Sequence, residues 1–250
     1  MSGIVSEYKK QQNLRDWDSL LENLTIKKGD QILDIGCSHG EVSSLFCNQG
    51  AHVIGIDMNA ELIAEAKKRD LPNATFYKSD ILNFESSLKF DGIWASYIAA
   101  YFTDLTPFIN KCQNLLKNGG WIALLEISDL FNHTPINSKF SNEIKGFYRY
   151  MFENKYYDFM SGEKIKPNIS NHKFINIEEK LVDDVEFTFR GKASADVYNS
   201  WKLRLNRMKG LKQYLKDPGE FNKCFLDSIK LDKHQSNCKV YFVTATKTQT

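Results

Sequence analysis

Between residues 30 and 127, short apolar runs alternate with longer amphipathic stretches, and this alternation limits the possible folds of the 250-residue chain more than any other feature. Apolar runs of strand length, separated by segments of helix length, are typical of repeated βα units around a mostly parallel sheet. The pattern predicts helices over 60–68 and 105–116 and five strands, at residues 31–35, 52–56, 75–77, 92–95 and 121–127.

Two later segments, 185–189 and 239–246, alternate apolar and polar residues, so each is expected to form a further strand. The stretches 130–180 and 193–236 are left over, and a five-strand unit does not require them. We expect both to be helical insertions that carry specificity. In the first, a helix that packs its apolar face is favoured by the spacing of Phe140, Ile144, Phe147 and Tyr148.

The composition excludes several classes of protein. The 42% hydrophobic content is that of an ordinary globular protein, no apolar stretch approaches the roughly 18 residues of a membrane span, and the first residues lack the pattern of a signal peptide. The five cysteines form no C-x-x-C pair and indicate neither a disulfide framework nor a zinc cluster. We expect a cytoplasmic protein with reduced thiols, no metal and no membrane association.

The sharpest motif is the turn after the first predicted strand, Asp34-Ile35-Gly36-Cys37-Ser38-His39-Gly40. Its two glycines allow a ligand to approach the backbone closely. The G-x-G-x-x-G spacing of a dinucleotide-binding turn is absent, and the Asp34 carboxylate at the strand tip would repel a pyrophosphate. The turn therefore favours a ligand with a positively charged group.

Two further acids follow the second and third predicted strands. Asp57 comes 23 residues after Asp34, at a strand end where an acid commonly binds ribose hydroxyls. Asp80 follows the next strand and can accept from an exocyclic amine, while Met58 and Ile81 can enclose an adenine ring. These positions predict a bound nucleoside.

In these motifs the chain resembles the class I S-adenosylmethionine-dependent methyltransferases. The resemblance covers about residues 28–127, in order and at the family's spacing, through five blocks: Asp34 to Gly40, Gly55-Ile56-Asp57-Met58, Ser79-Asp80-Ile81, Phe90-Asp91-Gly92-Ile93 and Leu115-Leu116-Lys117-Asn118-Gly119-Gly120. It implies a Rossmann-like α/β fold, with a seven-stranded sheet whose last strand is antiparallel and which helices flank. The sheet domain would comprise 1–129, 181–192 and 237–250, with 130–180 and 193–236 forming a helical cover over the active site.

The resemblance also implies a cofactor, S-adenosylmethionine, whose product is S-adenosylhomocysteine. Ser38 stands where the family's D-x-G-x-G-x-G pattern has its middle glycine, so cofactor binding is expected to be weakened but not abolished. Carried over position by position, the resemblance places Asp34, Gly36, Cys37 and Gly40 at the methionine part of the cofactor, Asp57 at the ribose, Asp80 at the adenine amine and Ser96 near the methyl group.

The acceptor end is less well defined. Segment 96–102 lacks the Asn/Asp-Pro-Pro-aromatic motif of nucleobase and glutamine amino-methyltransferases, which argues against exocyclic-amine methylation of nucleic acid. Together with the presence of His133, this makes oxygen the preferred target atom. His133 is the candidate general base, although a base is needed only if the acceptor must lose a proton. The candidates for the acceptor pocket, each with ordinary packing as the alternative, are Tyr8, Trp17, Tyr97 and Tyr101.

Residues 201–212 predict a helix that carries five cations and meets no acid before Asp217. Net charge is also uneven, at −5 for residues 1–130 and +7 for residues 131–250. The basic face is interpreted as solvated, as the site of an anionic acceptor held by Arg204 or Arg207, or as an RNA-binding surface. A pI near 8.1 is low for a nucleic-acid-binding domain, which favours the small anion over RNA.

These features predict a methyltransferase that acts on a small molecule, preferably by O-methylation, with an anionic metabolite as the favoured acceptor. The basic helix suggests an RNA or protein methyltransferase as one alternative. A protein that binds S-adenosylmethionine without transferring methyl groups is the other. Nucleic acid is not expected as a partner, and the chain is predicted to be a monomer or homodimer.

Overall fold

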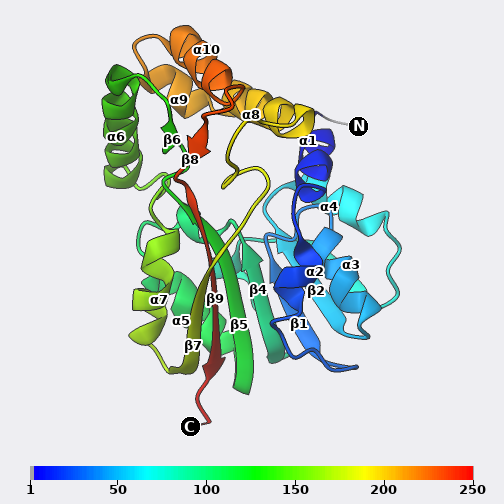
Figure 1. Ribbon diagram of the computed structural model, residues 1–250. Helices are drawn as coiled ribbons and strands as arrows, with labels where there is room; N and C mark the ends of the chain where they lie inside the picture. Colours follow the sequence, from blue (N-terminus) through cyan, green and yellow to red (C-terminus); the bar gives the residue numbers. More distant parts are fainter. Residues whose placement is uncertain (1–2, 250) are drawn as a thin grey trace.

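A seven-stranded sheet in the order β3-β2-β1-β4-β5-β9-β7 forms the centre of the computed structural model, which describes residues 3–249 (Figure 1). Strands β1 to β5 are parallel to one another, and β9 runs antiparallel between β5 and β7. The predicted α/β class with an antiparallel last strand is therefore confirmed. The strands are β1 Gln31–Ile35, β2 His52–Asp57, β3 Ala74–Lys78, β4 Phe90–Ser96, β5 Leu116–Ser128, β7 Phe174–Val182 and β9 Lys239–Lys247.

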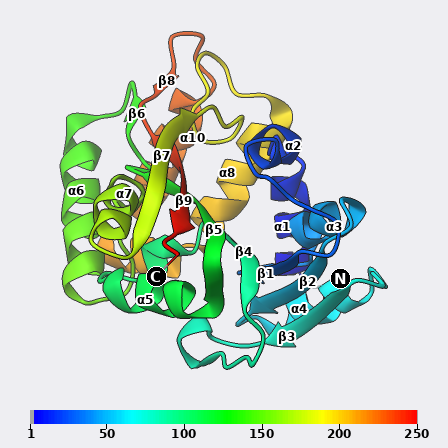
Figure 2. The same cartoon turned by 90° about the horizontal axis from the view of Figure 1, so that it is seen from below.

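Helices cover both faces of the sheet because its central strands are apolar on both sides. α2 (Trp17–Leu21) and α3 (Glu41–Asn48) lie on one side, and α5 (Thr106–Leu115) and α7 (Gly162–Ser170) lie on the other (Figure 2). α4 (Ala60–Lys67) packs against β2 and β3, and it begins where the Asn59 side chain accepts from the backbone N–H groups of Glu61 and Leu62. The helices predicted over 60–68 and 105–116 correspond to α4 and α5.

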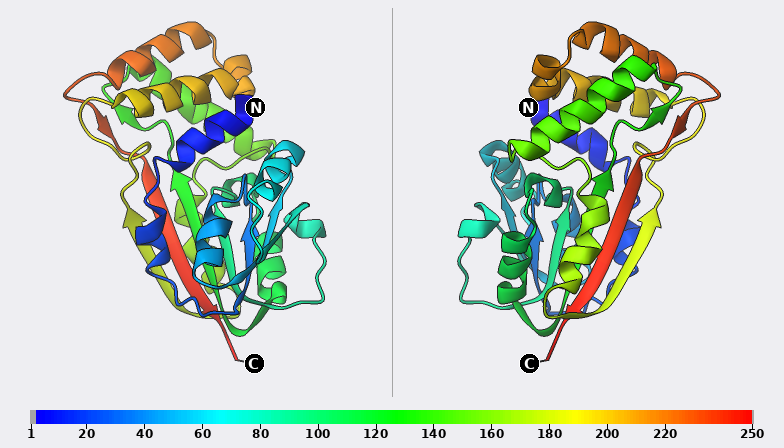
Figure 3. Two further views of the ribbon diagram at one scale, coloured as in Figure 1. Left: turned by 90° about the vertical axis from the view of Figure 1, so that its right-hand side faces the viewer. Right: turned by 90° about the vertical axis from the view of Figure 1, so that its left-hand side faces the viewer.

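A second helical layer lies across the end of the sheet at which the parallel strands finish (Figures 1 and 3). Its helix α6 (Ser138–Glu153) buries the face that carries Phe140, Ile144, Phe147 and Tyr148, as its spacing predicts. A two-stranded ladder of β6 (His133–Thr134) and β8 (Gln235–Ser236) connects this layer to β5 and β9. The other helices of the layer are α1 Gly3–Gln12, α8 Ala195–Arg207, α9 Lys209–Tyr214 and α10 Pro218–Ser228.

The helical layer shares one hydrophobic core with the sheet. Trp94 in β4 and Trp201 in α8 are both fully buried and belong to the same cluster of packed apolar side chains. Phe131, at the exit of β5, packs its ring at an angle against Trp201 and edge-on against Phe225, and so connects the two layers. The layer is therefore an integral part of the folded domain, because separating it from the sheet would expose this core.

The prediction of a strand at 185–189 is wrong. The Asp184 side chain accepts hydrogen bonds from the backbone N–H groups of Glu186 (2.8 Å) and Phe187 (2.9 Å), and the N–H of Thr188 donates to the carbonyl of Asp184. These local bonds hold the segment in a turn, which competes with pairing in a sheet. The edge strand is instead β7, most of which lies inside the stretch 130–180 predicted as the first helical insertion. Most side chains of β7 are exposed, so its apolar pattern is weak.

All five cysteines are free thiols. Within residues 3–249, no group of three or more His, Cys, Asp or Glu side chains is arranged to hold a metal ion. No helix in the described part of the chain combines the length and the apolar character needed to cross a membrane.

Candidate active site

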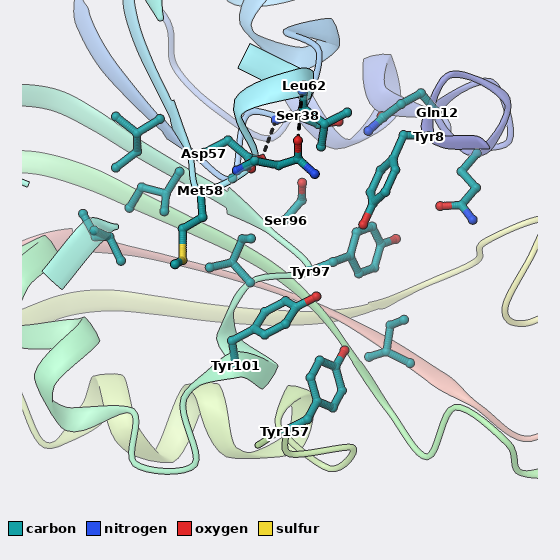
Figure 4. A pocket seen from close by; sticks show the side chains of 18 of the residues that line it. Tyr8, Gln12, Ser38, Asp57, Met58, Leu62, Ser96, Tyr97, Tyr101 and Tyr157 are labelled. Carbon is teal, nitrogen blue, oxygen red and sulfur yellow. Dashed lines mark hydrogen bonds between the residues drawn. The ribbon is translucent and has the colours of Figure 1, made fainter. Parts of the chain in front are cut away.

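A cavity of about 410 Å³ opens where the carboxyl ends of β1, β2, β3 and β4 meet the helical layer. One half of its wall comes from the ends of β1 to β4 and the turns after β1, β2 and β3, and we call this the cofactor half. The other half comes from α1, the segment after it, the turn after β4, the segment after α6, α8 and the turn after β7, and we call this the acceptor half. Figure 4 shows the two halves facing each other, with Asp57 and Met58 on one side and a group of tyrosines on the other.

The glycine turn shapes the cofactor half. Gly36, Ser38 and Gly40 have φ angles of +72°, +52° and +79°, the left-handed region that side chains other than glycine rarely adopt. In this conformation the N–H of Ser38 donates to Asp57 Oδ2 (3.0 Å), and the N–H of Asn59 donates to Oδ1 (2.8 Å), so the carboxylate is oriented by two backbone donors (Figure 4). Burial raises the pKa of Asp57, against the effect of these two bonds.

The part of the cofactor half predicted to hold the nucleoside is lined by apolar side chains and one acidic side chain. Met58 and Ile81 both line the cavity, and Met58 is 67% exposed although it is a large apolar side chain. Asp80 also lines it and accepts from the N–H of Leu82 (2.9 Å), which starts the short helix η1 (Ile81–Asn83). Ser96, at the end of β4, completes this half of the wall.

Three of the predicted cofactor residues do not line the cavity. The carboxylate of Asp34 is 2% exposed and accepts from Ser43 Oγ in α3, and burial and the nearby Asp57 raise its pKa to about 7. Cys37 packs behind the turn against Ala66 and Phe76. Gly40 lies at the start of α3. For these residues the structure contradicts a position on the cavity wall, because their side chains or backbone join the turn to α3 and α4.

The predicted acceptor residues do come together. Tyr8, Trp17, Tyr97 and Tyr101 all line the acceptor half, although they lie as far as 93 residues apart in sequence. Tyr157, for which no motif in the sequence predicts a role, faces Tyr101 with its ring centroid 5.1 Å away and the two rings perpendicular (Figure 4). The result is an aromatic wall directly opposite the strand ends.

Tyr97 occupies an unusual backbone conformation at the end of β4. Its φ of +58° is in the left-handed region, which is costly for a bulky residue and is maintained only when the surroundings determine it. Its N–H donates to the carbonyl of Leu125 (2.7 Å), its hydroxyl lies 3.2 Å from Asp184 Oδ2, and its ring packs edge-on against Phe187. The residue after Ser96 is thus held in place from three directions.

A buried ionic network lies behind the aromatic wall. Arg15 Nε lies 3.0 Å from Asp184 Oδ2, and Arg15 Nη2 lies 2.6 Å from Glu186 Oε2. Arg204 Nη2 and Ser200 Oγ, both from α8, donate to Glu186 Oε1 at 2.8 Å and 2.6 Å. Burial acts to raise the pKa of Glu186, but the guanidinium groups of Arg204 and Arg15 hold it at about 2. The network therefore contains two cations and two acids, and its charges cancel.

This network corrects the interpretation of the basic helix. Arg204 lines the cavity as predicted, but its charge is compensated by Glu186, which is distant in sequence and fully buried. Arg207 also lines the cavity, and its Nη1 lies 3.3 Å from Glu7 of α1. The two arginines therefore do not form an unpaired basic face.

The prediction of His133 as a general base is contradicted by its position. Its side chain is 1% exposed and does not reach the cavity wall. The ring lies between Trp201 and Phe225, with Nδ1 2.9 Å from Nε2 of His234. Burial and His234 lower its pKa to about 3. We therefore assign His133 to the packing of β6 and β8 against the helical layer.

Several wall residues gave no signal in the sequence. Gln12, Arg15, Tyr157 and Phe187 all line the acceptor half. Arg15 and Glu186, which form the shortest ion pair of the network, are separated by 171 residues. No local motif relates such positions, so only the folded chain shows that they share a site.

The profile of a family described as "Methyltransferase domain" matches residues 26–180, more than half of the chain. The chain belongs to this methyltransferase family. It is a class I S-adenosylmethionine-dependent methyltransferase, as the five sequence blocks predict. The matched range includes the glycine turn, Asp57, Asp80 and the whole parallel part of the sheet.

Two curated relatives are similar to this methyltransferase over less than half of its length. Malonyl-[acyl-carrier protein] O-methyltransferase of Enterobacter lignolyticus is 24% identical over 115 residues, which are 46% of this chain and 45% of the relative. Ubiquinone biosynthesis O-methyltransferase of Nitrobacter winogradskyi is 30% identical over 112 residues, 44% of this chain and 43% of the relative. The aligned part thus spans less than half of each of these relatives.

The fold is similar to that of a solved methyltransferase. Phosphoethanolamine N-methyltransferase 2 of Haemonchus contortus, in complex with phosphomonomethylethanolamine and S-adenosylhomocysteine, superposes with a TM-score of 0.60 and 19% identity. The match covers 93% of this chain and 52% of the other. At this identity the comparison shows a shared fold.

The cofactor half is suited to S-adenosylmethionine. Ser38 Oγ is buried on the cavity wall without a hydrogen-bond partner, and the exposed Met58 offers an apolar surface that a planar base would cover. Asp57 is oriented towards the same space by two backbone donors. When bound, S-adenosylmethionine supplies an electrophilic methyl group.

Proposed function

We propose that this methyltransferase transfers the methyl group of S-adenosylmethionine to a small-molecule acceptor, with oxygen as the preferred target atom and an anionic metabolite as the acceptor. The observation that carries the proposal is that the carboxyl ends of β1 to β4 and an aromatic wall face each other across one cavity. Two halves that share one cavity bring the acceptor and the methyl group into contact and exclude water.

The acceptor half favours an oxygen that is already ionised. No histidine lines the cavity, and Asp184 and Glu186, which lie behind its aromatic wall, are each paired with an arginine. Burial also raises the pKa values of Tyr97 and Tyr157, which keeps both hydroxyls protonated at neutral pH, so neither can act as a base. An acceptor that carries a negative oxygen at neutral pH requires no general base, so its reaction depends on positioning by the wall residues.

The size and charge of the cavity support a small molecule over a polymer. About 410 Å³ is at the lower end of the range for sites that hold small molecules, and the cofactor itself takes a large share. The pairing of Arg204 with Glu186 and of Arg207 with Glu7 removes the free cations that would bind RNA phosphates beside the cavity. An RNA or protein methyltransferase is therefore the weaker alternative.

Calorimetric titration of S-adenosylmethionine and S-adenosylhomocysteine into the purified protein tests the cofactor site. We expect binding in the wild type and a loss of affinity of about tenfold or more in Asp57→Asn, since a hydrogen bond to a charged group is removed. Asp91→Asn is the matched control, because Asp91 also accepts from a backbone N–H, that of Gln31, but lies away from the cavity. Equal affinities in the two variants would contradict the assignment of Asp57.

A label-transfer screen tests the acceptor. Incubation with methyl-labelled S-adenosylmethionine and a panel of small acids, phenols, amines and RNA should label an acid or another ionised oxygen compound. A product methylated at nitrogen would overturn the preference for oxygen. Cofactor binding without label transfer to any member of the panel would favour a protein that binds the cofactor without transferring its methyl group.

A further inference from the structure

Unpaired polar atoms are concentrated in one place. Ten buried side-chain polar atoms in residues 3–249 have no hydrogen-bond partner. Five of them belong to residues that line the active-site cavity, and one of these five, Arg207 Nη1, lies in an ion pair with Glu7, which leaves four without any partner. A buried polar group without a partner is costly, so such groups are few in native proteins and call for an explanation. Their concentration at one cavity indicates that a bound molecule provides the missing partners.

Three of these atoms come from the short segment that joins α1 to α2, residues 12–17. They are Gln12 Oε1, Arg15 Nη1 and Trp17 Nε1. Trp17 is 6% exposed, and the side chain of Arg15 is 5% exposed. Arginine and tryptophan nitrogens only donate, and the Gln12 amide presents a donor when its oxygen and nitrogen exchange places. The segment therefore offers hydrogen-bond donors to an oxygen-rich group.

The two donors are held rigidly. Arg15 uses Nε and Nη2 for Asp184 and Glu186, and its guanidinium group lies 4.5 Å from the centroid of the Phe187 ring, which leaves Nη1 as its unused nitrogen. Trp17 packs edge-on against Trp94, with ring centroids 6.1 Å apart. Rigid donors lose little entropy when a ligand binds, which favours specific recognition.

We propose that residues 12–17 recognise the acceptor and that they bind a carboxylate through Arg15 Nη1 and Trp17 Nε1. This inference rests on the proposed function and names the class of its acceptor, a small carboxylic acid with a flat body that fits the tyrosine wall. A carboxylate suits this site better than a phosphate dianion does. The network around Arg15 has no net charge, so it supplies donors for a monoanion but no excess positive charge for a second negative charge.

The test uses the full-length protein saturated with S-adenosylhomocysteine, and titrates it by calorimetry with benzoate, benzamide and inorganic phosphate. We expect benzoate to bind, and benzamide and phosphate to bind at least roughly tenfold more weakly, because a charged hydrogen bond is the stronger one. Trp17→Phe removes one donor and keeps the aromatic packing, so benzoate affinity should fall by roughly tenfold. Arg15→Lys, which keeps the charge but changes the donor geometry, should show a similar loss.

Trp121→Phe is the matched control, since the Trp121 indole nitrogen is also buried and unpartnered but Trp121 does not line the cavity, and its ring contact is with Phe46 rather than Trp17. It should leave benzoate affinity unchanged. The inference would be overturned by equal binding of benzoate and benzamide, by preferential binding of phosphate, or by an equal loss in Trp121→Phe and Trp17→Phe. Failure of S-adenosylhomocysteine to bind would instead reject the proposed function. Binding of S-adenosylhomocysteine without benzoate would reject only the carboxylate site.

Discussion

The two halves of the cavity are built in different ways. The cofactor half uses the ends of β1 to β4 and the turns that directly follow β1, β2 and β3, so each of its residues is positioned by the strand just before it. The acceptor half collects side chains from α1, the segment 12–17, the turn after β4, the segment after α6, the turn after β7 and α8. Its parts are held together by ion pairs and aromatic contacts between segments up to about 170 residues apart, such as Arg15 and Glu186.

This difference has consequences for stability and specificity. In the cofactor half, hydrogen bonds between backbone and side chain within one or two turns define the site, as at Asp57. In the acceptor half, the loss of one buried partner leaves charges uncompensated in several segments at once. The cofactor half can therefore be retained while the acceptor half changes its ligand, which is how one fold hosts many methyl acceptors.

The largest expected effect of a single substitution is at Glu186. Glu186→Gln should lower the free energy of unfolding by about 3–5 kcal/mol, because it leaves Arg204 buried without its carboxylate and Arg15 with Asp184 as its remaining acidic partner. Urea denaturation measures the change. The exposed Glu85, which pairs with Lys111, provides the control, and Glu85→Gln should cost about 1 kcal/mol or less. Similar losses in the two variants would show that the network does not hold the acceptor half together.

A smaller effect with a distinct pH dependence is expected at Asp34 in the cofactor half. The folded-state pKa is about 7 and the ordinary value is 3.8, so the unfolded state releases this proton first as pH rises. Stability from this group is therefore present below about pH 4 and is lost as pH rises through about 7. Asp34→Asn keeps an acceptor for Ser43 but has no charge. At pH 8 its free energy of unfolding should exceed that of the wild type by at least about 2 kcal/mol, since each unit of pKa shift corresponds to about 1.4 kcal/mol.

Urea midpoints at pH 4, 6 and 8 provide the measurement for Asp34→Asn. The difference between variant and wild type should vanish towards pH 4. Parallel stability curves over this range would show that Asp34 is not the titrating group.

Ser38 provides a test of backbone strain in the cofactor half. Ser38→Gly should raise the stability of the cofactor-free protein by about 1 kcal/mol, because glycine adopts a φ of +52° without steric cost. Ser38→Ala is the comparison, since alanine removes the unpartnered hydroxyl but keeps the strain. Thermal unfolding distinguishes the two causes. An equal gain in both variants would attribute the effect to the hydroxyl group.

The smallest effect is expected at His133, which lies outside both halves of the cavity. On an acceptor found by label transfer, His133→Gln should change the rate per folded molecule by no more than about twofold. Loss of a general base would instead reduce the rate by about 100-fold or more. A loss of that size would support His133 as the general base and would mean that the cavity extends to β6.

The sequence predicts the cofactor half well because its signals are local. Gly36, Ser38, Asp57, Asp80 and Met58 follow predicted strands directly, and all of them line the cavity. The errors for Asp34 and Cys37 are errors of side-chain direction, which depends on the packing of α3 and α4 against the turn. Tyr8, Trp17, Tyr97 and Tyr101 were selected as candidate aromatics, but only the folded chain brings them together.

By itself, the sequence determined the order of the βα units, the left-handed glycine turn and the acids at the strand ends, because each depends on a few neighbouring residues. The tertiary structure alone decided that β7 pairs with β9 at the edge of the sheet, that Arg15 and Arg204 share Glu186, and that His133 lies in the core. The physical reason is distance along the chain. Backbone geometry acts over a few residues, whereas burial and charge pairing depend on which distant segments the folded core brings into contact.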